Sequence, residues 1–435
     1  MKRKIIIVTQ DFSGLGFAKI AHDQGDDVLI AYKPSDKEEK DDLEKYETVG
    51  EGIVDKVELD KAIKLYRGKG YYWIFDMNYL SEYSEKLRSM GEKVFGASKL
   101  TDDMEHKREF GTEIAKKAGL QILPTFECKT LEDGIAFLEQ HKDEAWVFKP
   151  DEADESDLTF VPSNWEDEDA NNELQRYMKS LDYSGTYILQ KRVKGLEANV
   201  EVWIYKGTPF FAFCTLENKK KLNHDAGMAV GCSQDILFTI QLDSKLVKNT
   251  VGKMFSYYQG IRYTGFADMN VIIQDNNFWF IEFCNRWGYN SHPNLFINLA
   301  IDNFGDIICD FIDGKIQDFY KHFRYGFGAS ITLYIDKPKP ALPLYIKDCV
   351  KKDFFHFDTF AIDDELYLAG YCKEVGIICK HGFTIEEAAG EALACIDTYE
   401  EISYPNIAYR SDLSEDNWPT SPRRRYTALK AMNLI

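Results

Sequence analysis

The sequence lacks three features that mark specialised classes of protein. Its nine cysteines are scattered, odd in number and never spaced as C-x-x-C, which argues against a disulfide framework or a zinc site and favours reduced thiols. No apolar run approaches the roughly 18 residues of a membrane span. The run that follows the basic start is only Ile5–Val8, shorter than the roughly 7–15 residues of a signal sequence. We therefore expect a cytoplasmic protein with no membrane partner.

An excess of basic residues is also missing. The chain has 53 Lys and Arg against 72 Asp and Glu in 435 residues, a net charge of −19. A nucleic-acid surface would be basic, so we expect no nucleic-acid partner, although a local basic pocket for a small anion remains compatible. What the chain does have is length and apolar content, with 44% hydrophobic and 14% aromatic residues. This is enough for two or three globular domains.

The pattern along the chain changes twice and predicts three domains: 1–100, 101–330 and 331–435. The first opens at 4–33 as strand, glycine-containing turn, helix and strand, which is the βαβ start of a doubly wound α/β sheet. Gly14 and Gly16 lie in that turn, but the third glycine of a dinucleotide fingerprint is absent. We therefore interpret them as packing glycines.

Local signals in the other two domains are turns and helix caps. Thr101 can cap the first helix of the middle domain, which Gly119 ends. The alternating runs 198–216 and 267–283 each carry a turn at their middle and predict β-hairpins. Near the C-terminus, "TIEE" at 384–387 is a capping box for an amphipathic helix. The acidic, glycine-free segment 151–174 reads as a solvated, mobile loop pair.

The residues that could carry chemistry follow an order that suits a nucleotide held between two sheets. Lys107 lies in a predicted helix and Lys149 ends a strand, and a lysine-rich turn and the stretch "IEFCNR" (281–286) come later. Lysines neutralise phosphates, and carboxylates hold Mg²⁺, which prefers oxygen ligands. Taken singly, each lysine is more typical of an ordinary surface or strand-end position than of a ligand, and only their order favours a site.

Several stretches resemble the ATP-grasp ligases, and within them the glycinamide ribonucleotide synthetases (phosphoribosylamine–glycine ligases). "ENKKKLNHDAGMAVGC" (217–232) is similar to the family's D-H-K-R-x-x-D-x-D-x-G-P-N-T-G-G, and "FIEFCNRWG" (280–288) to its L-E-F-N-x-R-F-G. Segment 94–127 resembles the start of the grasp domain, and 376–413 resembles the C-terminal domain. Matching positions in these motifs are Lys219, Asp225, Gly227, Gly231, Glu282, Arg286, Gly288, Tyr409, Arg410 and Asp412.

This resemblance implies a fold and an activity. The fold would be α/β and α+β: an ATP-grasp domain between an N-terminal doubly wound α/β domain and a small C-terminal α/β domain. The activity would be ATP-dependent carboxylate–amine ligation through an acyl phosphate, as in purine biosynthesis, with small-molecule amine and carboxylate substrates. The family's own substrates are glycine and phosphoribosylamine. We expect a monomer or homodimer.

The resemblance also implies roles for individual residues. ATP and Mg²⁺ (or Mn²⁺) would be the cofactors. The implied roles are nucleotide phosphates for Lys107 and Lys149, adenine for Gln190, Lys191 and Val193, ribose for Glu197, catalysis for Arg286, Lys219 and Asp225, and metal for Asp268, Glu282 and Asn285.

The metal site departs from the family motif. Cys284 stands where the family has its amide ligand, and Asn285 follows it. Strand side chains alternate, so Asn285 points away from Glu282 unless a β-bulge at Phe283–Cys284 turns it back. A thiol is a poor Mg²⁺ ligand. Otherwise the site would consist of Glu282 with Asp268 or Asn270 from the preceding hairpin strand. Of these we favour Asp268 with Glu282, and water in the vacant position.

Other departures support a rival function. Polar residues of the family's G-P-N-T-G-G motif are replaced at 228–230, its D-P-E becomes 289–291, and its glycine-rich phosphate flap becomes the acidic 151–157. Glycine lets backbone N–H groups approach phosphate, whereas carboxylates repel it. These changes make another amine and acid plausible. They also favour the alternative, a non-catalytic descendant that serves as a nucleotide-binding or structural module.

Overall fold

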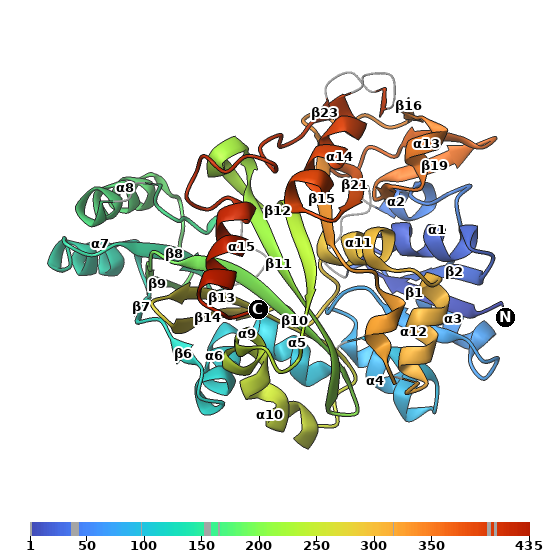
Figure 1. Ribbon diagram of the computed structural model, residues 1–435, viewed down its shortest axis with the longest axis horizontal. Helices are drawn as coiled ribbons and strands as arrows, with labels where there is room; N and C mark the ends of the chain where they lie inside the picture. Colours follow the sequence, from blue (N-terminus) through green and yellow to red (C-terminus); the bar gives the residue numbers. More distant parts are fainter. Residues whose placement is uncertain are drawn as a thin grey trace.

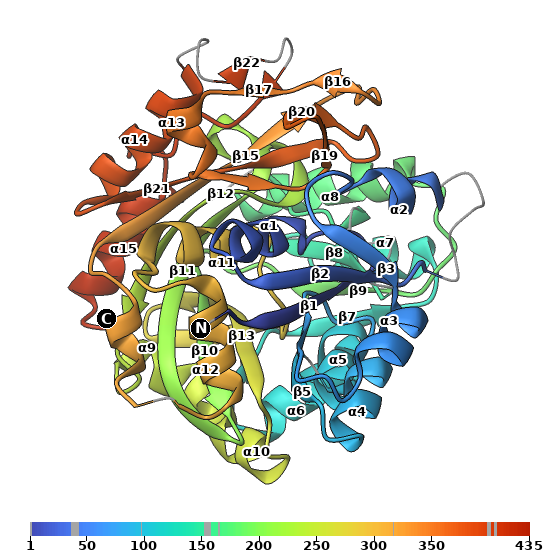
Figure 2. The same ribbon diagram turned by 90° about the vertical axis from the view of Figure 1, so that its right-hand side faces the viewer.

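The computed structural model places an N-terminal sheet at one end of the molecule, a small sheet at the other and a long antiparallel sheet between them (Figure 1). The structure describes residues 2–35, 43–96, 98–151, 158–163, 166–315, 317–397, 402–403 and 407–435. The C-terminal strands from β15 (Phe327–Ile335) onwards form one end of the long sheet or lie beside that end, in the upper half of Figure 2.

The N-terminal sheet is parallel, with strand order β3-β2-β1-β4-β5. Its strands alternate with helices, so the predicted doubly wound α/β opening is confirmed. Alternate β1 residues face opposite layers: Ile6 and Val8 pack with α3 and α4, and Ile5 and Ile7 with α1. The elements are β1 Lys4–Thr9, α1 Leu15–Asp23, β2 Asp27–Tyr32, α2 Glu44–Thr48, β3 Asp55–Glu58, α3 Leu59–Tyr66, β4 Tyr72–Phe75, α4 Ser81–Ser89 and β5 Lys93–Phe95.

Gly14 and Gly16 are packing glycines, as the sequence suggested. A Cβ at Gly14 would lie 2.6 Å from a carboxylate oxygen of Asp76, and one at Gly16 would lie 2.4 Å from the ring of Phe355. Side chains at these positions would push α1 away from the strand ends and from the C-terminal elements.

The helical stretch after the N-terminal sheet is broken into two helices. These are α5 Lys99–His106 and α6 Arg108–Lys117, with Lys107 between them. Ser98, and not Thr101, is the N-cap, and Thr101 is its capping-box partner. Gly119 follows the second helix with φ +82°, so the predicted end is confirmed.

The small sheet has the order β7-β9-β8 and is antiparallel. Its helices α7 and α8 lie at the far left of Figure 1. Helix α8 covers residues that were predicted as loop, so that prediction is wrong from Asp167 onwards; 152–157, in the predicted flap, lie outside the described residues. The elements are β7 Thr125–Cys128, α7 Leu131–Gln140, β8 Trp146–Pro150, α8 Asp167–Ser180 and β9 Tyr187–Lys191.

The long sheet runs β18-β21-β15-β12-β11-β10-β13-β14-β6. The predicted hairpins are its pairs β10–β11 and β13–β14. Because it continues from strands before residue 330 into later ones, the division into three domains stays a prediction. The strands are β6 Gln121–Ile122, β10 Leu196–Tyr205, β11 Thr208–Leu222, β12 Ala226–Ile240, β13 Gly265–Gln274, β14 Asn277–Phe283, β15 Phe327–Ile335, β18 Phe354–His356, β21 Glu374–Gly382 and, beside β15, β23 Ile407–Ala408.

One face of the long sheet forms an apolar core with α6, α14 and α15. Part of the other face packs against α1, α11 and α12. Thr384 caps α14 by accepting the Glu387 N–H at 3.1 Å. The remaining elements are α9 Lys245–Asn249, α10 Phe255–Gly260, α11 Ser291–Asn294, α12 Phe304–Ile312, β16 Leu342–Pro343, β17 Tyr345–Ile346, α13 Asp348–Lys351, β19 Thr359–Ile362, β20 Glu365–Leu368, α14 Ile385–Asp397, β22 Ile402–Ser403 and α15 Pro422–Ala431.

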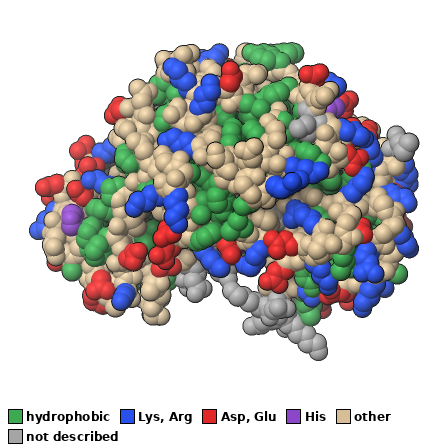
Figure 3. Space-filling model, turned by 90° about the horizontal axis from the view of Figure 1, so that it is seen from below, with side chains coloured by type: hydrophobic (Ala, Val, Ile, Leu, Met, Phe, Trp, Pro, Cys, Tyr) green, Lys and Arg blue, Asp and Glu red, His purple; other side chains and the backbone are tan. Residues whose placement is uncertain are grey.

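The surface in Figure 3 carries acidic and basic side chains interspersed with apolar ones. The net charge of −19 is therefore not gathered into one acidic patch on that face. In the described part of the chain, no helix is both long enough and apolar enough to cross a membrane.

Candidate active site

The face of the long sheet that packs in part against α1, α11 and α12 is polar in the part they leave free. Register fixes this, because side chains opposite each other on paired strands point to the same face. Asn199 lies opposite Asn270, Glu201 opposite Asp268, and Asn270 opposite Glu282. Three adjacent strands, β10, β13 and β14, thus bring acids and amides from distant parts of the sequence onto one surface.

A bulge in β14 places Glu282 on that surface. Phe280 pairs with Val271 and Glu282 with Asn270, so Ile281 is the extra residue. If the strand paired regularly without a bulge, Ile281 would lie opposite Asn270, and Glu282 would follow Phe280 onto the apolar face. The bulge predicted at Phe283–Cys284 thus lies two residues earlier in the strand, at Ile281. The bulge exists, but it re-aims the carboxylate and not Asn285.

Asn285 points to the opposite side of the strand. It is 2% exposed, its carbonyl accepts from the Tyr258 hydroxyl at 3.3 Å, and its amide lies 3.5 Å from the Thr101 carbonyl. The alternative in which Asn285 is a metal ligand is therefore wrong. Cys284 does share the face of Glu282, and its sulfur lies 3.5 Å from the amide nitrogen of Asn270.

Cations surround Glu282. The Lys219 ammonium lies 2.9 Å from Glu197 and 3.8 Å from Glu282, and the Asn270 amide donates to Glu282 at 3.1 Å. Desolvation alone would raise the pKa of Glu282, but Lys219, Lys149 and Arg108 outweigh it and hold the pKa below its usual value. The Glu282 side chain is 49% exposed, so a ligand can reach this charge.

Lys149, on β8 of the small sheet, lies close enough to Glu282, Arg108 and Lys219 to feel their charges. Burial lowers its pKa to about 8, with the cations Arg108 and Lys219 acting in the same direction and Glu282 opposing them. An ammonium beside two other cations is poised to take an anion such as phosphate. Lys149 and Lys219 therefore come together, as the order of motifs suggested.

Lys107 does not join them. Its side chain is 63% exposed and pairs with Asp103 at 3.2 Å. The next residue, Arg108, lies near Glu282 instead, because burial lowers the pKa of Arg108 and the charge of Glu282 opposes that lowering. Its Nη1 is buried without a hydrogen-bond partner. Because the chain breaks its helix at Lys107, adjacent side chains leave in different directions. The prediction missed the cation by one position.

Asp268 lies on the same face as Glu282 but among other acids. Burial raises its pKa well above the usual range, and Glu201 raises it further. Glu201 lies opposite Asp268 and 2.9 Å from His292. The predicted pairing of Asp268 with Glu282 is thus indirect, because Asn270 is the direct neighbour of Glu282.

Oxygen donors on this face fit a divalent cation. The Oδ1 atoms of Asn199, Asp268 and Asn270 and Oε2 of Glu201 are buried without hydrogen-bond partners. Such atoms are costly unless a ligand satisfies them. Within the described ranges, no group of three or more His, Cys, Asp or Glu could hold a metal alone. This suits Mg²⁺, which is usually bound through one or two carboxylates with phosphate and water.

The predicted adenine residues lie where the small sheet leads into the long one. Gln190 pairs with Thr125 and Val147 within the small sheet. Lys191 forms an ion pair with Glu144 at 3.1 Å, and Val193 lies in the connection to β10. Glu197 lies near the start of β10 and pairs with Lys219. The connection from the small sheet therefore leads to the cations around Glu282.

The last two predicted residues, Arg286 and Asp225, bind protein partners. Arg286 pairs with Glu105 at 2.9 Å, and its guanidinium carbon lies 5.4 Å from the centre of the Tyr289 ring. Asp225 pairs with Arg410 at 2.7 Å and accepts from Thr420. Asp225 thus ties the β11–β12 hairpin to the C-terminal segment.

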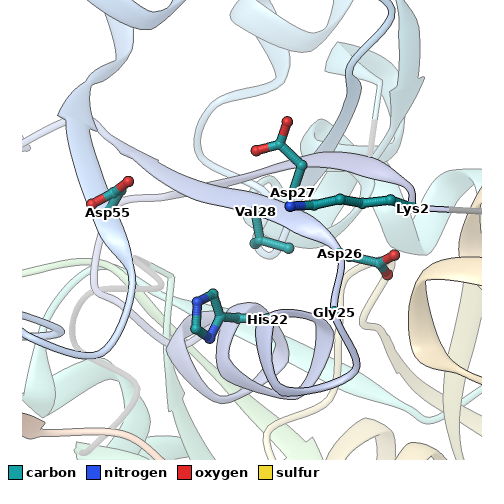
Figure 4. Close-up of a pocket in the computed structure, with 7 residues that line it drawn as sticks. All are labelled: Lys2, His22, Gly25, Asp26, Asp27, Val28 and Asp55. Carbon is teal, nitrogen blue, oxygen red and sulfur yellow. The ribbon is translucent and has the colours of Figure 1, made fainter.

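A separate hollow of about 330 Å³ lies elsewhere, at the start of β1–β3. Lys2, His22, Asp26, Asp27 and Asp55 surround it (Figure 4). In open α/β sheets, ligands bind beyond the carboxyl ends of the strands, and this hollow lies at the amino ends. It is therefore not part of the candidate site.

The sequence offered Asn270 as the alternative to Asp268, and the structure makes Asn270 the direct neighbour of Glu282. Three other residues near the candidate site, Arg108, Asn199 and Glu201, were not predicted. Arg108 carried no signal beyond its neighbour. Glu201 and Asn199 alternate with apolar residues in "EANVEVW", a pattern typical of a half-buried strand.

Comparisons with known proteins were made at the level of sequence and of structure. No protein-family model matches the sequence, and no curated protein matches it. Among solved structures, phosphoribosylamine–glycine ligase from Thermotoga maritima is similar with a TM-score of 0.68 at 16% identity, covering 94% of this chain and 99% of that one.

Two further solved structures are similar. The biotin carboxylase domain of Hydrogenobacter thermophilus 2-oxoglutarate carboxylase, in complex with MgADP, ADP and bicarbonate, has a TM-score of 0.62 at 12% identity and covers 99% of this chain and 98% of that one. L-amino acid ligase from Bacillus licheniformis has 0.56 at 13%, with 92% and 98% covered. At these identities the likeness concerns the fold, and the fold of this chain is the ATP-grasp fold.

Proposed function

We propose that the protein is an ATP-dependent ligase that joins a small carboxylate to a small amine through an acyl phosphate. The observation that carries the proposal is the group formed by Lys149, Arg108, Lys219, Glu282 and Asn270. Cations from the small sheet and the preceding helix face a carboxylate and an amide on the long sheet. The ligases with the same fold, named above, support this reading.

Each part of the group has a task in that chemistry. Lys149 and Arg108 would bind phosphate oxygens, since both carry charge and Arg108 has an unused donor. Glu282 and Asn270 would hold Mg²⁺, which supplies charge neutralisation on the phosphates when bound. Arg286, at the end of the same strand, would face the acyl phosphate. Fixed charges that already surround the reacting group lower the barrier without reorganisation.

A rival is a nucleotide-binding module without ligase activity. It is favoured by Cys284, which places a soft thiol on the metal-facing side, and by Lys219, whose charge is already neutralised by Glu197 and Glu282. The rival predicts nucleotide binding without turnover.

Measurements of nucleotide binding and of ADP release distinguish the ligase from the nucleotide-binding module. Millimolar Mg–ATP should raise the melting temperature of the full chain by mass action, and ADP should be released when a matching amine and acid are supplied from a panel. Glu282→Gln keeps the shape of the side chain and removes its charge, so it should lower ADP release at least a hundredfold. Glu113→Gln, on the exposed side of α6, is the matched control.

Each outcome decides between them. A melting temperature that does not move with Mg–ATP contradicts both functions. A clear shift with no ADP release from any pair supports the module. Activity of Glu282→Gln within about threefold of the parent would show that this carboxylate is not in the reacting site.

A further inference from the structure

A second crevice lies beside the candidate site, at the carboxyl ends of β1 and β4. The order β3-β2-β1-β4-β5 makes the β1/β4 pair the place where the winding of the sheet reverses. Ligands of open α/β sheets bind at such reversal points. A small cavity of about 10 Å³ opens here, lined by Ser13, Phe17, Asp76, Trp287, Gly288, Tyr289 and Phe357.

The protein's own carboxylate fills the anion position of this crevice. Asp76 is 3% exposed, and its Oδ2 accepts from the Gly14 N–H at 2.7 Å and from the Ser13 hydroxyl at 3.2 Å. In sheets of this kind, the first turn and the start of the following helix commonly bind a phosphate. Here Asp76 takes those donors, so they are not available to a phosphate.

One acceptor atom of this crevice remains unused, because Oδ1 of Asp76 is buried without a hydrogen-bond partner. Two residues further along the chain, Asn78 is 1% exposed, and neither its amide oxygen nor its amide nitrogen has a partner. Asp11 adds a second carboxylate, 3.4 Å from the Tyr289 hydroxyl. Burial, together with the charge of Asp11, raises the pKa of Asp76 to about 8 against its hydrogen-bond donors. A positively charged group would pair with the unused oxygen and favour the ionised form of Asp76.

The crevice adjoins the candidate site directly. Trp287, Gly288 and Tyr289 follow Arg286 in the chain, and the Arg286 guanidinium carbon lies 5.4 Å from the centre of the Tyr289 ring. A group held at Asp76 would therefore lie beside the end of β14, where the proposed acyl phosphate would form. A cavity of about 10 Å³ has room for about one water, and an ammonium group is of similar size.

We propose that this crevice binds the ammonium end of the amine substrate, and that this substrate is an unphosphorylated, positively charged primary amine. Its role as a substrate rests on the proposed ligase function, whereas its binding does not. The class differs from phosphoribosylamine, because Asp76 takes the donors that a phosphate would need.

Binding of two small amines to the full-length protein tests the proposal. The probes are 1,4-diaminobutane and O-phosphoethanolamine, titrated calorimetrically against the parent, Asp76→Asn and Asp55→Asn. Asp76→Asn keeps an oxygen for the Gly14 N–H and removes the charge. Asp55→Asn makes the same change in the hollow of Figure 4. We expect the diamine to bind the parent and Asp55→Asn alike, and Asp76→Asn at least tenfold more weakly.

A second variant covers the case in which Asp76→Asn does not fold. Asp11→Asn changes an exposed loop side chain, and it should weaken diamine binding several-fold. Preferential binding of O-phosphoethanolamine, no binding of the diamine, or equal diamine binding by the parent and the folded variants would each overturn the proposal. Competition by Mg²⁺ alone would make this a metal site, which also overturns it.

Mg–ATP titrations on the same samples keep the two proposals apart. If the diamine binds as expected and Mg–ATP does not, the ligase function fails and the amine site stands. If Mg–ATP binds and the diamine does not, the amine site fails and the ligase function stands.

Discussion

At the scale of single residues, Lys149 is a cation of the candidate site whose charge changes not far above neutral pH. Its pKa of about 8 lies below the ordinary value because of burial and neighbouring cations. A bound phosphate would favour its charged form, so binding takes up a proton once the free protein has lost it. ATP affinity should therefore be constant below about pH 7 and fall above pH 8, by at most roughly tenfold per pH unit.

Dissociation constants for ATP measured from pH 6.5 to 9.5 check this prediction. Lys149→Arg is the matched variant, since arginine stays charged throughout this range, and its affinity should be nearly flat. If the parent and Lys149→Arg lose affinity in parallel, Lys149 is not the titrating group.

The neighbours Cys284 and Asn285 give a second prediction at this scale. Cys284→Asn should preserve or raise turnover, because an amide oxygen on the face of Glu282 is a harder ligand for Mg²⁺ than a thiol. Asn285→Ala should leave nucleotide affinity within about twofold. It should cost about 1–3 kcal/mol of stability, because it leaves the buried Tyr258 hydroxyl and Thr101 carbonyl without this partner.

Nucleotide titration and chemical denaturation of both variants provide the measurement. A large loss of nucleotide affinity in Asn285→Ala, with little change in stability, would show that Asn285 reaches the ligand after all.

At the scale of elements, the bulge at Ile281 decides which face Glu282 joins. Deleting Ile281 removes the extra residue, so Glu282 would follow Phe280 directly and stay opposite Asn270 in a regular register. Glu282 would therefore keep its face of the sheet, and Mg–ATP binding should be retained. Combining the deletion with Glu282→Val should abolish the binding, because the carboxylate is then missing from that face.

Denaturation curves and Mg–ATP titrations of the parent and the variants test this register argument. Glu282→Val in the full-length strand is the control, because it removes the charge without moving the register, and it should lose the binding as well. Loss of nucleotide binding in the deletion variant alone, with the fold intact, would mean that Ile281 is not the extra residue of the strand.

At the scale of the whole molecule, the C-terminal helix α15 holds together two strands that carry residues of the candidate site. Arg425 of α15 is buried and donates to the carbonyls of Glu197 and Glu217 at 3.2 and 2.9 Å and to Asn218 at 2.7 Å. These bonds join the ends of β10 and β11, which carry Glu197 and Lys219. The chain's end thus fixes strands that lie some two hundred residues earlier.

Arg425→Met should therefore lower both stability and nucleotide affinity. Leaving three buried acceptors without a donor should cost about 2–4 kcal/mol. Arg424→Met changes an exposed arginine on the same helix and should be nearly silent. Urea denaturation and Mg–ATP titration of both variants check this, and equal effects would contradict the supporting role.

The sequence by itself determined the elements and their order. Alternation of apolar residues predicted both hairpins, the βαβ start predicted the parallel sheet, and cap and glycine signals marked helix ends, because these patterns depend on neighbours in the chain. The ordered motifs also brought Lys149, Lys219 and Glu282 into one expected site.

Only the tertiary structure decided which neighbouring residue faces the site. A helix break at Lys107 selects Arg108, a bulge at Ile281 turns Glu282 to the polar face and leaves Asn285 behind it, and register makes Asn270 and not Asp268 its direct partner. Helix α8 likewise forms where the acidic composition suggested a loop, because its apolar side packs on the small sheet. A shift of one residue along a strand turns a side chain to the opposite face of the sheet. The sequence pattern does not show such a shift, so the face that each residue takes depends on packing between distant strands.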